Sequence, residues 1–426
     1  MSMNEQLQEL IGQTRKTLGL NNHTLKRHNI FREINAWCET YYLLSMEWFP
    51  NDAVIVDEDL NPAGTASVEI NLFTKEIRNI TFVENVNTAD TSIYPKLENK
   101  KAMIKWIETM TGLTYDRHFI RENDTDEEHK QRFMAAVEHT PVYPGGNILI
   151  KVNDDGILTV FDINGVFPNE DQIASEPFAL TLPQYESVAQ AACKLLTLPD
   201  QAKEAWVFVY GIEEFYLTND GKQTVPYENK NLSSYVEEDM ILTWSAPLNG
   251  EFTTQAINRS SVVTLETALA NKAHPDAYPL TEAEVAACEQ EVLRFMRLVY
   301  PDDSGKWRLT GIYLDNNLII AEISAVTTVQ NVLNPKIKLI INRDTLTALN
   351  YIDQNRLFAG MFQTFTETRH PEVSQTEAFN TLREHLEVRP VYVHDSGKNR
   401  YFKYAKINCA YGVNAVTGEL MDLTDV

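Results

Sequence analysis

Histidine and cysteine are the side chains of this sequence best suited to metal binding or nucleophilic chemistry, and their spacing supports neither. The four cysteines have no C-x-x-C pair, whereas zinc sites usually place cysteines about two to four residues apart. No H-E-x-x-H motif occurs, and His23 and His28 are too far out of phase for one helix face. We expect buried free thiols, with two disulfides also compatible with the sequence, and scattered surface or half-buried histidines. These residues are Cys38, Cys193, Cys288 and Cys409, and His23, His28, His118, His129, His139, His274, His370, His385 and His394.

Glycine-containing segments give no nucleophile or phosphate site either. The sequence has no G-x-S-x-G, G-x-x-x-x-G-K-[ST] or G-x-G-x-x-G motif. The segments at Ser304 and Ser396 read Asp-Ser-Gly, a pattern that turn geometry alone explains. Gly145 and Gly146 follow Pro144 in a turn too short to surround a phosphate. We therefore predict no catalytic, cofactor-binding or metal-binding residue.

Two acidic clusters could offer oxygen ligands to calcium. They comprise Asp57, Glu58 and Asp59, and Asp124, Asp126 and Glu128. Neither has the glycine at the sixth position and the glutamate at the twelfth that an EF-hand loop requires. Both are expected to be solvated loops.

Aromatic side chains are the remaining candidates for a functional surface. Alternating aromatics on strands usually form core or cross-strand pairs. Any that face outward would form a patch for a protein or peptide. The two aromatic segments contain Trp37, Tyr41, Tyr42, Trp48 and Phe49, and Tyr392, Tyr401, Phe402, Tyr404 and Tyr411.

Net charge limits the classes of partner. The chain carries 37 Lys and Arg against 60 Asp and Glu, for a formal charge of −23. Such a surface repels nucleic acid and anionic membranes, and the candidates for a basic patch are the pairs Lys26-Arg27 and Lys100-Lys101. The charge serves solubility or, alternatively, a cation-rich partner or divalent ion. No apolar run predicts a membrane span, and the first 20 residues lack a secretory signal, so we expect a cytoplasmic protein.

One pattern occurs twice in the sequence and suggests the architecture. Residues 68–83 and 337–352 each read as two apolar strands around a short charged turn, and a proline-started helix follows at Pro95 and Pro371. A helix with one apolar stripe and a meander with one apolar face bury each other. We expect an α+β fold of tandem repeats, each an amphipathic helix packed on an antiparallel sheet.

A length of 426 residues suggests two to four domains. We predict an N-terminal pair of repeats at 1–168, a diverged middle unit at 169–275 and a C-terminal pair at 276–426. Helices are expected at 4–18, 96–111, 183–196, 281–299 and 374–386, the last two started by capping boxes at Thr281 and Ser374. Strands are expected at 38–49, 65–73, 77–83, 149–161 (a hairpin), 205–211, 240–246, 307–314, 318–327, 336–351 (a pair), 390–394, 401–413 and 419–423.

The closing hairpin carries a family resemblance. Its sequence, Tyr411-Gly-Val-Asn-Ala-Val-Thr-Gly-Glu-Leu420, is similar to that of a PepSY-like unit. Two such pairs with a middle copy resemble the YcdB/YcdC repeated-domain family of Gram-positive bacteria. The resemblance implies an inhibitory or chaperone-like module rather than an assigned reaction. This chain departs from the family in having no export signal, which argues against a cell-wall role.

Our functional prediction is a non-enzymatic binding or regulatory protein that binds a peptide or protein along a sheet edge or in a groove. Two alternatives remain. One is a hydrolase whose site is assembled from different repeats, and the other is a structural scaffold that oligomerises. The sequence leaves the oligomeric state open.

Overall fold

The computed structural model describes the chain except for residues 1–2, 55–58, 91–92, 95, 98, 123–128, 202, 227–232, 327–329, 332–335, 355, 357–363, 367–369, 396 and 424–426. The described residues form two compact units. Unit 1 comprises residues 1–175, 260–277 and 392–402, and unit 2 comprises 176–259, 278–391 and 403–426. None of the described helices is long and apolar enough to cross a membrane. The three-part division of the chain at 168 and 275 remains a prediction.

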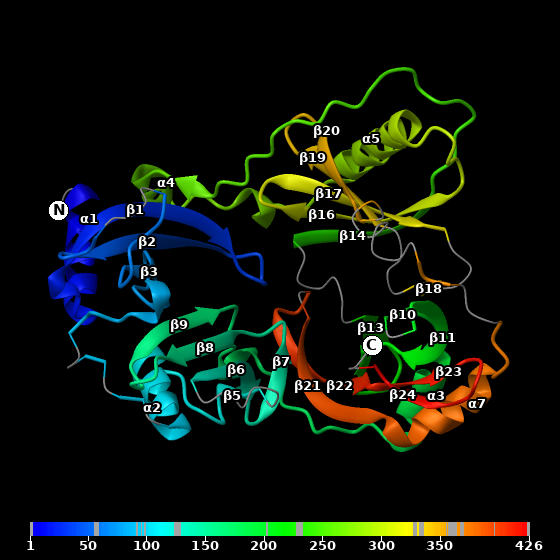
Figure 1. The fold of residues 1–426 in the computed structure, drawn as a ribbon, viewed down its shortest axis with the longest axis horizontal. Helices are drawn as coiled ribbons and strands as arrows, with labels where there is room; N and C mark the ends of the chain where they lie inside the picture. The colour runs from blue at the N-terminus through cyan, green and yellow to red at the C-terminus, as the bar shows by residue number, and fades with distance from the viewer. Residues whose placement is uncertain are drawn as a thin grey trace. The chain divides into compact units, whose positions relative to one another are not determined.

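Unit 1 is built on one large sheet with strand order β15-β1-β2-β3-β4-β9-β8-β6-β7, and β5 pairs with β6 (Figure 1). Its elements are α1 (Met3–Thr17), η1 (Leu20–Asn22), β1 (His23–Ile34), β2 (Thr40–Pro50), β3 (Ala66–Asn71), β4 (Ile77–Phe82), η2 (Val83–Asn85), α2 (Lys100–Thr111), β5 (Phe119–Arg121), β6 (Lys130–Val137), β7 (Thr140–Tyr143), β8 (Asn147–Val152), β9 (Leu158–Asn164), η3 (Glu170–Gln172), β15 (Val262–Val263), α4 (Leu265–Leu269) and η4 (Pro275–Ala277).

The two faces of this sheet differ because side chains alternate along each strand. On β2, Tyr42, Leu44 and Met46 are fully buried and join one core cluster with apolar residues of α1 and α2. The residues between them, including Tyr41 and Leu43, are only half-buried and face the other way. Both helices therefore cover the same face, and the opposite face is free to carry polar groups.

Unit 2 contains two five-stranded sheets, ordered β18-β10-β11-β23-β24 and β14-β16-β17-β19-β20. Its elements are α3 (Leu182–Ala192), β10 (Cys193–Asp200), β11 (Ala205–Ile212), β12 (Phe215–Thr218), β13 (Thr224–Pro226), β14 (Ser233–Ile241), α5 (Glu282–Val299), β16 (Trp307–Asp315), β17 (Leu318–Ala325), β18 (Gln330–Asn331), β19 (Lys336–Asn342), β20 (Thr347–Asp353), α7 (Gln375–Leu382), η5 (Arg383–His385), β23 (Tyr411–Asn414) and β24 (Leu420–Asp422). Strands β21 (Glu387–Asp395) and β22 (Arg400–Asn408) contain the two ends of the unit 1 segment 392–402, and residues 404–407 of β22 pair with β12 in unit 2.

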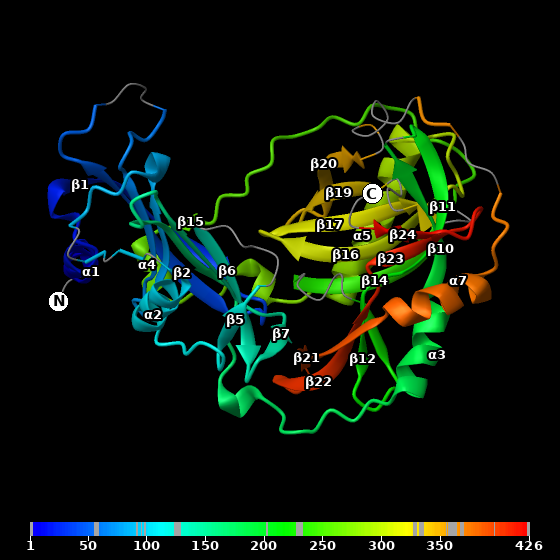
Figure 2. The same cartoon turned by 60° about the horizontal axis from the view of Figure 1, so that its bottom comes forward.

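Helices in unit 2 begin where the sequence predicts. The capping boxes of α5 (Thr281 with Glu284) and α7 (Ser374 with Glu377) are both confirmed. Helix α5 packs on the β16–β17–β19 sheet through Val292 and other apolar residues. Helices α3 and α7 lie side by side (Figure 2), joined by an ion pair of 2.7 Å between Arg383 Nε and Glu186 Oε1.

Three hairpins share one turn, and two of them are the repeated pattern of the sequence. In the β3–β4, β19–β20 and β23–β24 hairpins, an asparagine side chain accepts a hydrogen bond from the amide three residues on, at 2.9–3.0 Å. The asparagine carbonyl accepts another from the amide four residues on, at 2.8–2.9 Å. That fourth residue has a positive φ of 53–76°. The asparagines are Asn71, Asn342 and Asn414, and the fourth residues are Lys75, Leu346 and Gly418.

The predicted fold class, an α+β chain of tandem helix-on-sheet repeats, is wrong. Strands far outnumber helices in the described chain, and the sheets are large and mixed. Strand β7 pairs in parallel with β21, and β10 pairs in parallel with β18. The prediction assumed that neighbours in sequence pair, but β4–β9, β1–β15 and β11–β23 join distant segments. Short turns determine which strands form hairpins, and they do not determine how hairpins join.

Several element boundaries also need correction. The helix predicted at 183–196 ends at Ala192, and its last four residues belong to β10, which pairs with β11. Strand β1 was not predicted, and the strand predicted at 240–246 is β14 at Ser233–Ile241. The single strand predicted at 401–413 is β22 and β23, separated by Cys409 and Ala410. Apolar residues at helical spacing also fit a half-buried strand over a few positions.

Candidate functional site

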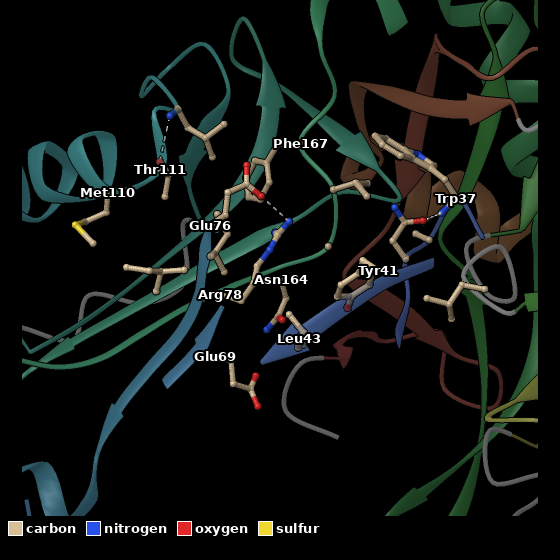
Figure 3. Close-up of a pocket in the computed structure, with 18 of the residues that line it drawn as sticks. Trp37, Tyr41, Leu43, Glu69, Glu76, Arg78, Met110, Thr111, Asn164 and Phe167 are labelled. Atoms are coloured by element: carbon tan, nitrogen blue, oxygen red, sulfur yellow. Dashed lines mark hydrogen bonds and ion pairs between the residues drawn. The ribbon is translucent and has the colours of Figure 1, made fainter. Parts of the chain in front are cut away.

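A cavity of about 470 Å³ lies in unit 1, between strands of its sheet and the C-terminal end of α2 (Figure 3). Its volume falls within the roughly 300–1,000 Å³ of typical small-ligand sites. Strands β2, β3, β4 and β9 contribute residues that face away from the core, such as Tyr41, Leu43 and Glu69, and also Ile163, which belongs to the core. Its lining comprises Ile34, Asn35, Ala36, Trp37, Tyr41, Leu43, Glu69, Glu76, Ile77, Arg78, Met110, Thr111, Leu113, Ile163, Asn164, Gly165, Val166, Phe167 and Asn169.

The polar side of the cavity continues into a row of cross-strand neighbours. Ser45, Glu69, Asn79 and Asp162 face one another in register across β2, β3, β4 and β9. The Asn79 side-chain amide donates to Asp162 Oδ1 at 3.2 Å, and the Asn164 amide donates to Asp162 Oδ2. The amides therefore satisfy Asp162, whereas the one side-chain hydrogen bond of Glu69 among the described residues is with Ser45.

Glu69 is a half-buried carboxylate among other acids. Burial raises the pKa of Glu69 above its ordinary value of 4.5, and the charges of Asp162 and Glu33 raise it further. Burial and Glu33 also raise the pKa of Tyr41 on the neighbouring strand. In the part of the chain that the structure describes, no ion pair links Glu69 to a basic side chain. The site would favour a positive charge brought by a ligand.

Arg78 provides the complementary group in the same cavity. Its Nη2 lies 3.2 Å from Glu76 Oε2, and Figure 3 shows that contact apart from Glu69. Its Nε is buried and has no hydrogen-bond partner. A buried donor without a partner costs free energy, which an acceptor on a ligand would recover. The cavity thus presents the Glu69 carboxylate and the Nε–H of Arg78, which are not paired with each other.

Aromatic rings form the apolar wall of the cavity. The Trp37 indole N–H donates to the Tyr401 hydroxyl at 3.1 Å, and that hydroxyl donates to the Pro144 carbonyl at 2.8 Å. Phe167 packs against the same cluster. A Cβ at Gly146 would overlap the Phe167 ring, so the glycine is needed to seat it. The wall is held in place before any ligand binds.

The structure separates the aromatic residues singled out in the sequence. Tyr42 and Trp48 are core residues, as the alternating pattern predicts for most of them. Trp37 and Tyr401 come from opposite ends of the chain and meet, and His394 lies against both. Tyr41 is half-buried in the cavity lining. The others are Phe49, Tyr392, Phe402, Tyr404 and Tyr411, all buried or half-buried.

Cysteine and histidine need one correction each. Cys193, Cys288 and Cys409 are buried free thiols, as expected, but Cys38 is exposed. Burial raises the pKa of Cys193 to about 11 and that of Cys288 to about 12. The prediction that every histidine is exposed or half-buried is wrong for His23 and His274, which are 0% and 4% exposed. Burial lowers the pKa of each, which favours a neutral ring.

The acidic clusters give no metal site that can be described. Asp57, Glu58 and the cluster at 124–128 lie outside the described residues, as does Ser396. No group of three or more His, Cys, Asp or Glu that could hold a metal ion occurs among the residues that are described.

Sequence reasoning missed Glu69, Arg78, Asn164 and Phe167. A signal for Glu69 was present, because it lies between Val68 and Ile70 and must face away from the core if they face toward it. No sequence signal placed β9 beside β4, so Asn164 and Phe167 could not be assigned to the same face.

Comparison with known proteins does not identify a family. No protein-family model matches the chain, and no curated protein matches it. One solved structure, the Bacillus megaterium YpeB C-terminal domain, is similar over 81% of this chain and 96% of that chain. The identity is 9% and the TM-score is 0.26, so the two folds are not shown to be the same.

Proposed function

We propose that this chain is a non-enzymatic binding protein whose unit 1 cavity binds a short peptide segment. A cationic group of the peptide lies at Glu69, a carbonyl or carboxylate accepts from Arg78, and an apolar side chain packs against Trp37 and Phe167. Amines, carbonyls and apolar side chains occur together in peptides, which is why this ligand class fits the lining better than a purely apolar one.

The observation that carries the proposal is that Glu69 has no basic partner among the described residues and shares a cavity with the buried Nε of Arg78, which has no hydrogen-bond partner. A protein gains nothing in stability from a half-buried carboxylate whose neighbours are acidic. Such a group is retained where a bound partner supplies the missing charge. Its position on a central strand of a large sheet holds it rigidly, which lowers the entropic cost of binding.

Calorimetric titration with an acetylated tripeptide, Lys-Phe-Gly with a free carboxylate, tests the proposal. The comparator replaces lysine with norleucine, which removes the charge and keeps the length. The wild-type chain should bind the lysine peptide about tenfold more tightly, the effect of one partly desolvated charge pair. Glu69→Gln should abolish that preference.

Glu138→Gln is the matched control, since Glu138 is an exposed glutamate of unit 1 outside the cavity lining. It should keep the preference for lysine. If the wild-type chain binds the two peptides with equal affinity, Glu69 does not contact the peptide. If Glu138→Gln also loses the preference for lysine, the preference comes from the overall charge of the protein.

A further inference from the structure

The outer edge of the unit 1 sheet is only partly covered. Strand β15 pairs with β1 at two positions, Ile30↔Val263 and Phe31↔Val262. The chain then leaves the edge, because Thr264 caps helix α4. No strand among the described residues pairs with residues 24–29 on the side away from β2. Thr24 and residues 26–29 are exposed.

The direction of the main-chain groups on this edge follows from two hydrogen bonds. The Arg32 amide donates to the Ser261 carbonyl at 2.9 Å, so Arg32 points away from β2. The Leu72 amide donates to the Tyr42 carbonyl at 2.8 Å, so Tyr42 bonds β3 rather than β1. Main-chain groups alternate in direction along a strand. His28, four residues before Arg32, therefore points its N–H and C=O outward, and Asn29 bonds to β2.

This edge is basic on a chain that is strongly acidic. Residues 23–32 contain Lys26, Arg27 and Arg32 and no acidic residue. Arg15 adds another cation, since its guanidinium donates to the Leu20 and Asn21 carbonyls just before β1. Glu47 on β2 pairs with Arg27 on the sheet face. Lys26 is exposed and lies at the bulge between Leu25 and Arg27.

These charges select among the strands that could pair here. Like charges directly opposite on paired strands are unfavourable, so a second copy of the same edge is disfavoured. An extended segment with alternating acidic residues would gain both main-chain hydrogen bonds and charge complementarity. Lysine on an edge also discourages aggregation, which is the competing explanation of the same residues.

We propose that the open edge of β1, residues 24–29, binds an extended acidic peptide segment as an added strand that continues the pairing begun by β15. His28 supplies the outward main-chain donor and acceptor, and Lys26 supplies the charge, since Arg27 is already paired with Glu47. This site is separate from the cavity, and its test does not depend on a cavity ligand.

Fluorescence anisotropy with a labelled hexapeptide of alternating Glu and Val tests the proposal on the full-length chain. One comparator has Lys in place of Glu, and another is N-methylated at alternate amides, which removes strand hydrogen bonding. The wild-type chain should bind the acidic peptide at least tenfold more tightly than either. Amide hydrogen exchange at His28 should slow when the acidic peptide is bound.

Two substitutions at one position isolate the main-chain hydrogen bond, because both remove the same side chain and proline alone also removes the N–H. His28→Pro removes the outward N–H and breaks no hydrogen bond between β1 and β2, and an edge strand tolerates proline at such a position. We expect about tenfold weaker binding for His28→Pro and a change within threefold for His28→Ala. Urea denaturation confirms that each variant is folded. If the N-methylated peptide binds as tightly as the acidic peptide, or if the two variants bind with equal affinity, the peptide adsorbs to the basic patch and does not pair as a strand. If the wild-type chain does not bind the acidic peptide, the basic residues of this edge serve only to prevent aggregation.

Discussion

The β3–β4 hairpin of unit 1 and the β19–β20 hairpin of unit 2 are built on the same turn, and they carry a carboxylate and an apolar side chain at one matching position. Asn71 and Asn342 begin the same turn, an offset of 342 − 71 = 271 residues. Both hairpins shift register at the matching position, after Glu69↔Asn79 in one and after Ile340↔Asn350 in the other. Glu69 thus occupies the backbone position that Ile340 occupies in the second hairpin.

The surroundings of Glu69 and Ile340 differ in polarity, as the two side chains do. Ile340 is 2% exposed and belongs to an apolar cluster with Tyr313, Leu318 and Ile320. Glu69 faces the cavity, with Ser45 and Asn79 as its neighbours. The hairpin therefore folds with either residue, and the carboxylate is not needed for the backbone. This contrast is the structural reason for assigning Glu69 to binding.

The largest effect is expected when the carboxylate is placed in the apolar copy. Ile340→Glu would bury a charge among Tyr313 and Ile320, and Lys338 already pairs with Glu322. We expect a loss of about 2–4 kcal/mol in the free energy of unfolding. Urea denaturation measures it, with Ile340→Leu as the control of unchanged polarity. A loss as small as that of Ile340→Leu would show that this face tolerates charge and would weaken the contrast with Glu69.

A smaller loss is expected from Glu322, an acid on the β14-β16-β17-β19-β20 sheet that has a basic partner. Glu322 lies opposite Lys338 in register, with a Glu322 Oε1–Lys338 Nζ distance of 2.9 Å. Burial alone would lower the pKa of Lys338, but its bonds to Glu322 and Tyr313 raise it. Glu322→Gln should cost about 1–2 kcal/mol, because it leaves the lysine half-buried without its counter-charge.

The double variant Glu322→Leu with Lys338→Met should recover part of that loss, because it removes both charges. Urea denaturation of Glu322→Gln and of the double variant measures both changes. If Glu322→Gln proves neutral, then this pair contributes no more than an exposed one, and pairing would not distinguish Glu322 from Glu69.

The shared turn allows a third comparison at its left-handed residue. Lys75 and Leu346 have φ of 63° and 53° where the third hairpin has Gly418. A left-handed conformation costs about 1 kcal/mol or more for a residue other than glycine. Lys75→Gly should therefore raise the free energy of unfolding by up to about 1 kcal/mol, reduced by the greater flexibility of the unfolded chain. Leu346→Gly should gain less or lose, because Leu346 packs on the unit 2 core. Thermal denaturation of both variants measures the difference, and an equal gain in both would show that Leu346 adds no packing.

The sequence predicts those parts of the fold and of the cavity that depend on residues close together in the chain. Helix caps at Thr281 and Ser374 and the repeated hairpins are local, and they were predicted. The sequence comparison placed 68 opposite 337, an offset of 337 − 68 = 269, whereas the shared turn requires 271. The pairing of β4 with β9 depends on packing between distant segments, and no turn encodes it. Because the cavity is formed by that pairing, its residues could not be assembled from sequence.

The smallest expected effect tests Glu69 itself through pH. Its folded-state pKa is raised above 4.5, so the folded chain favours the protonated carboxyl. A raised pKa stabilises the fold fully below the unfolded pKa and loses that stabilisation as pH rises through the folded value. Relative to Glu69→Gln, the wild-type chain should therefore lose a few tenths of a kcal/mol between pH 4 and 7, since the group is partly screened by solvent.

Urea denaturation of the two proteins at matched pH values measures this difference. The same comparison of the wild-type chain with Glu138→Gln serves as the control. Stability that instead rises with pH for the wild-type chain would mean that Glu69 has a cationic partner in the free protein. The bound peptide would then have to displace that partner. An unpaired carboxylate would no longer distinguish the unit 1 hairpin from its unit 2 counterpart.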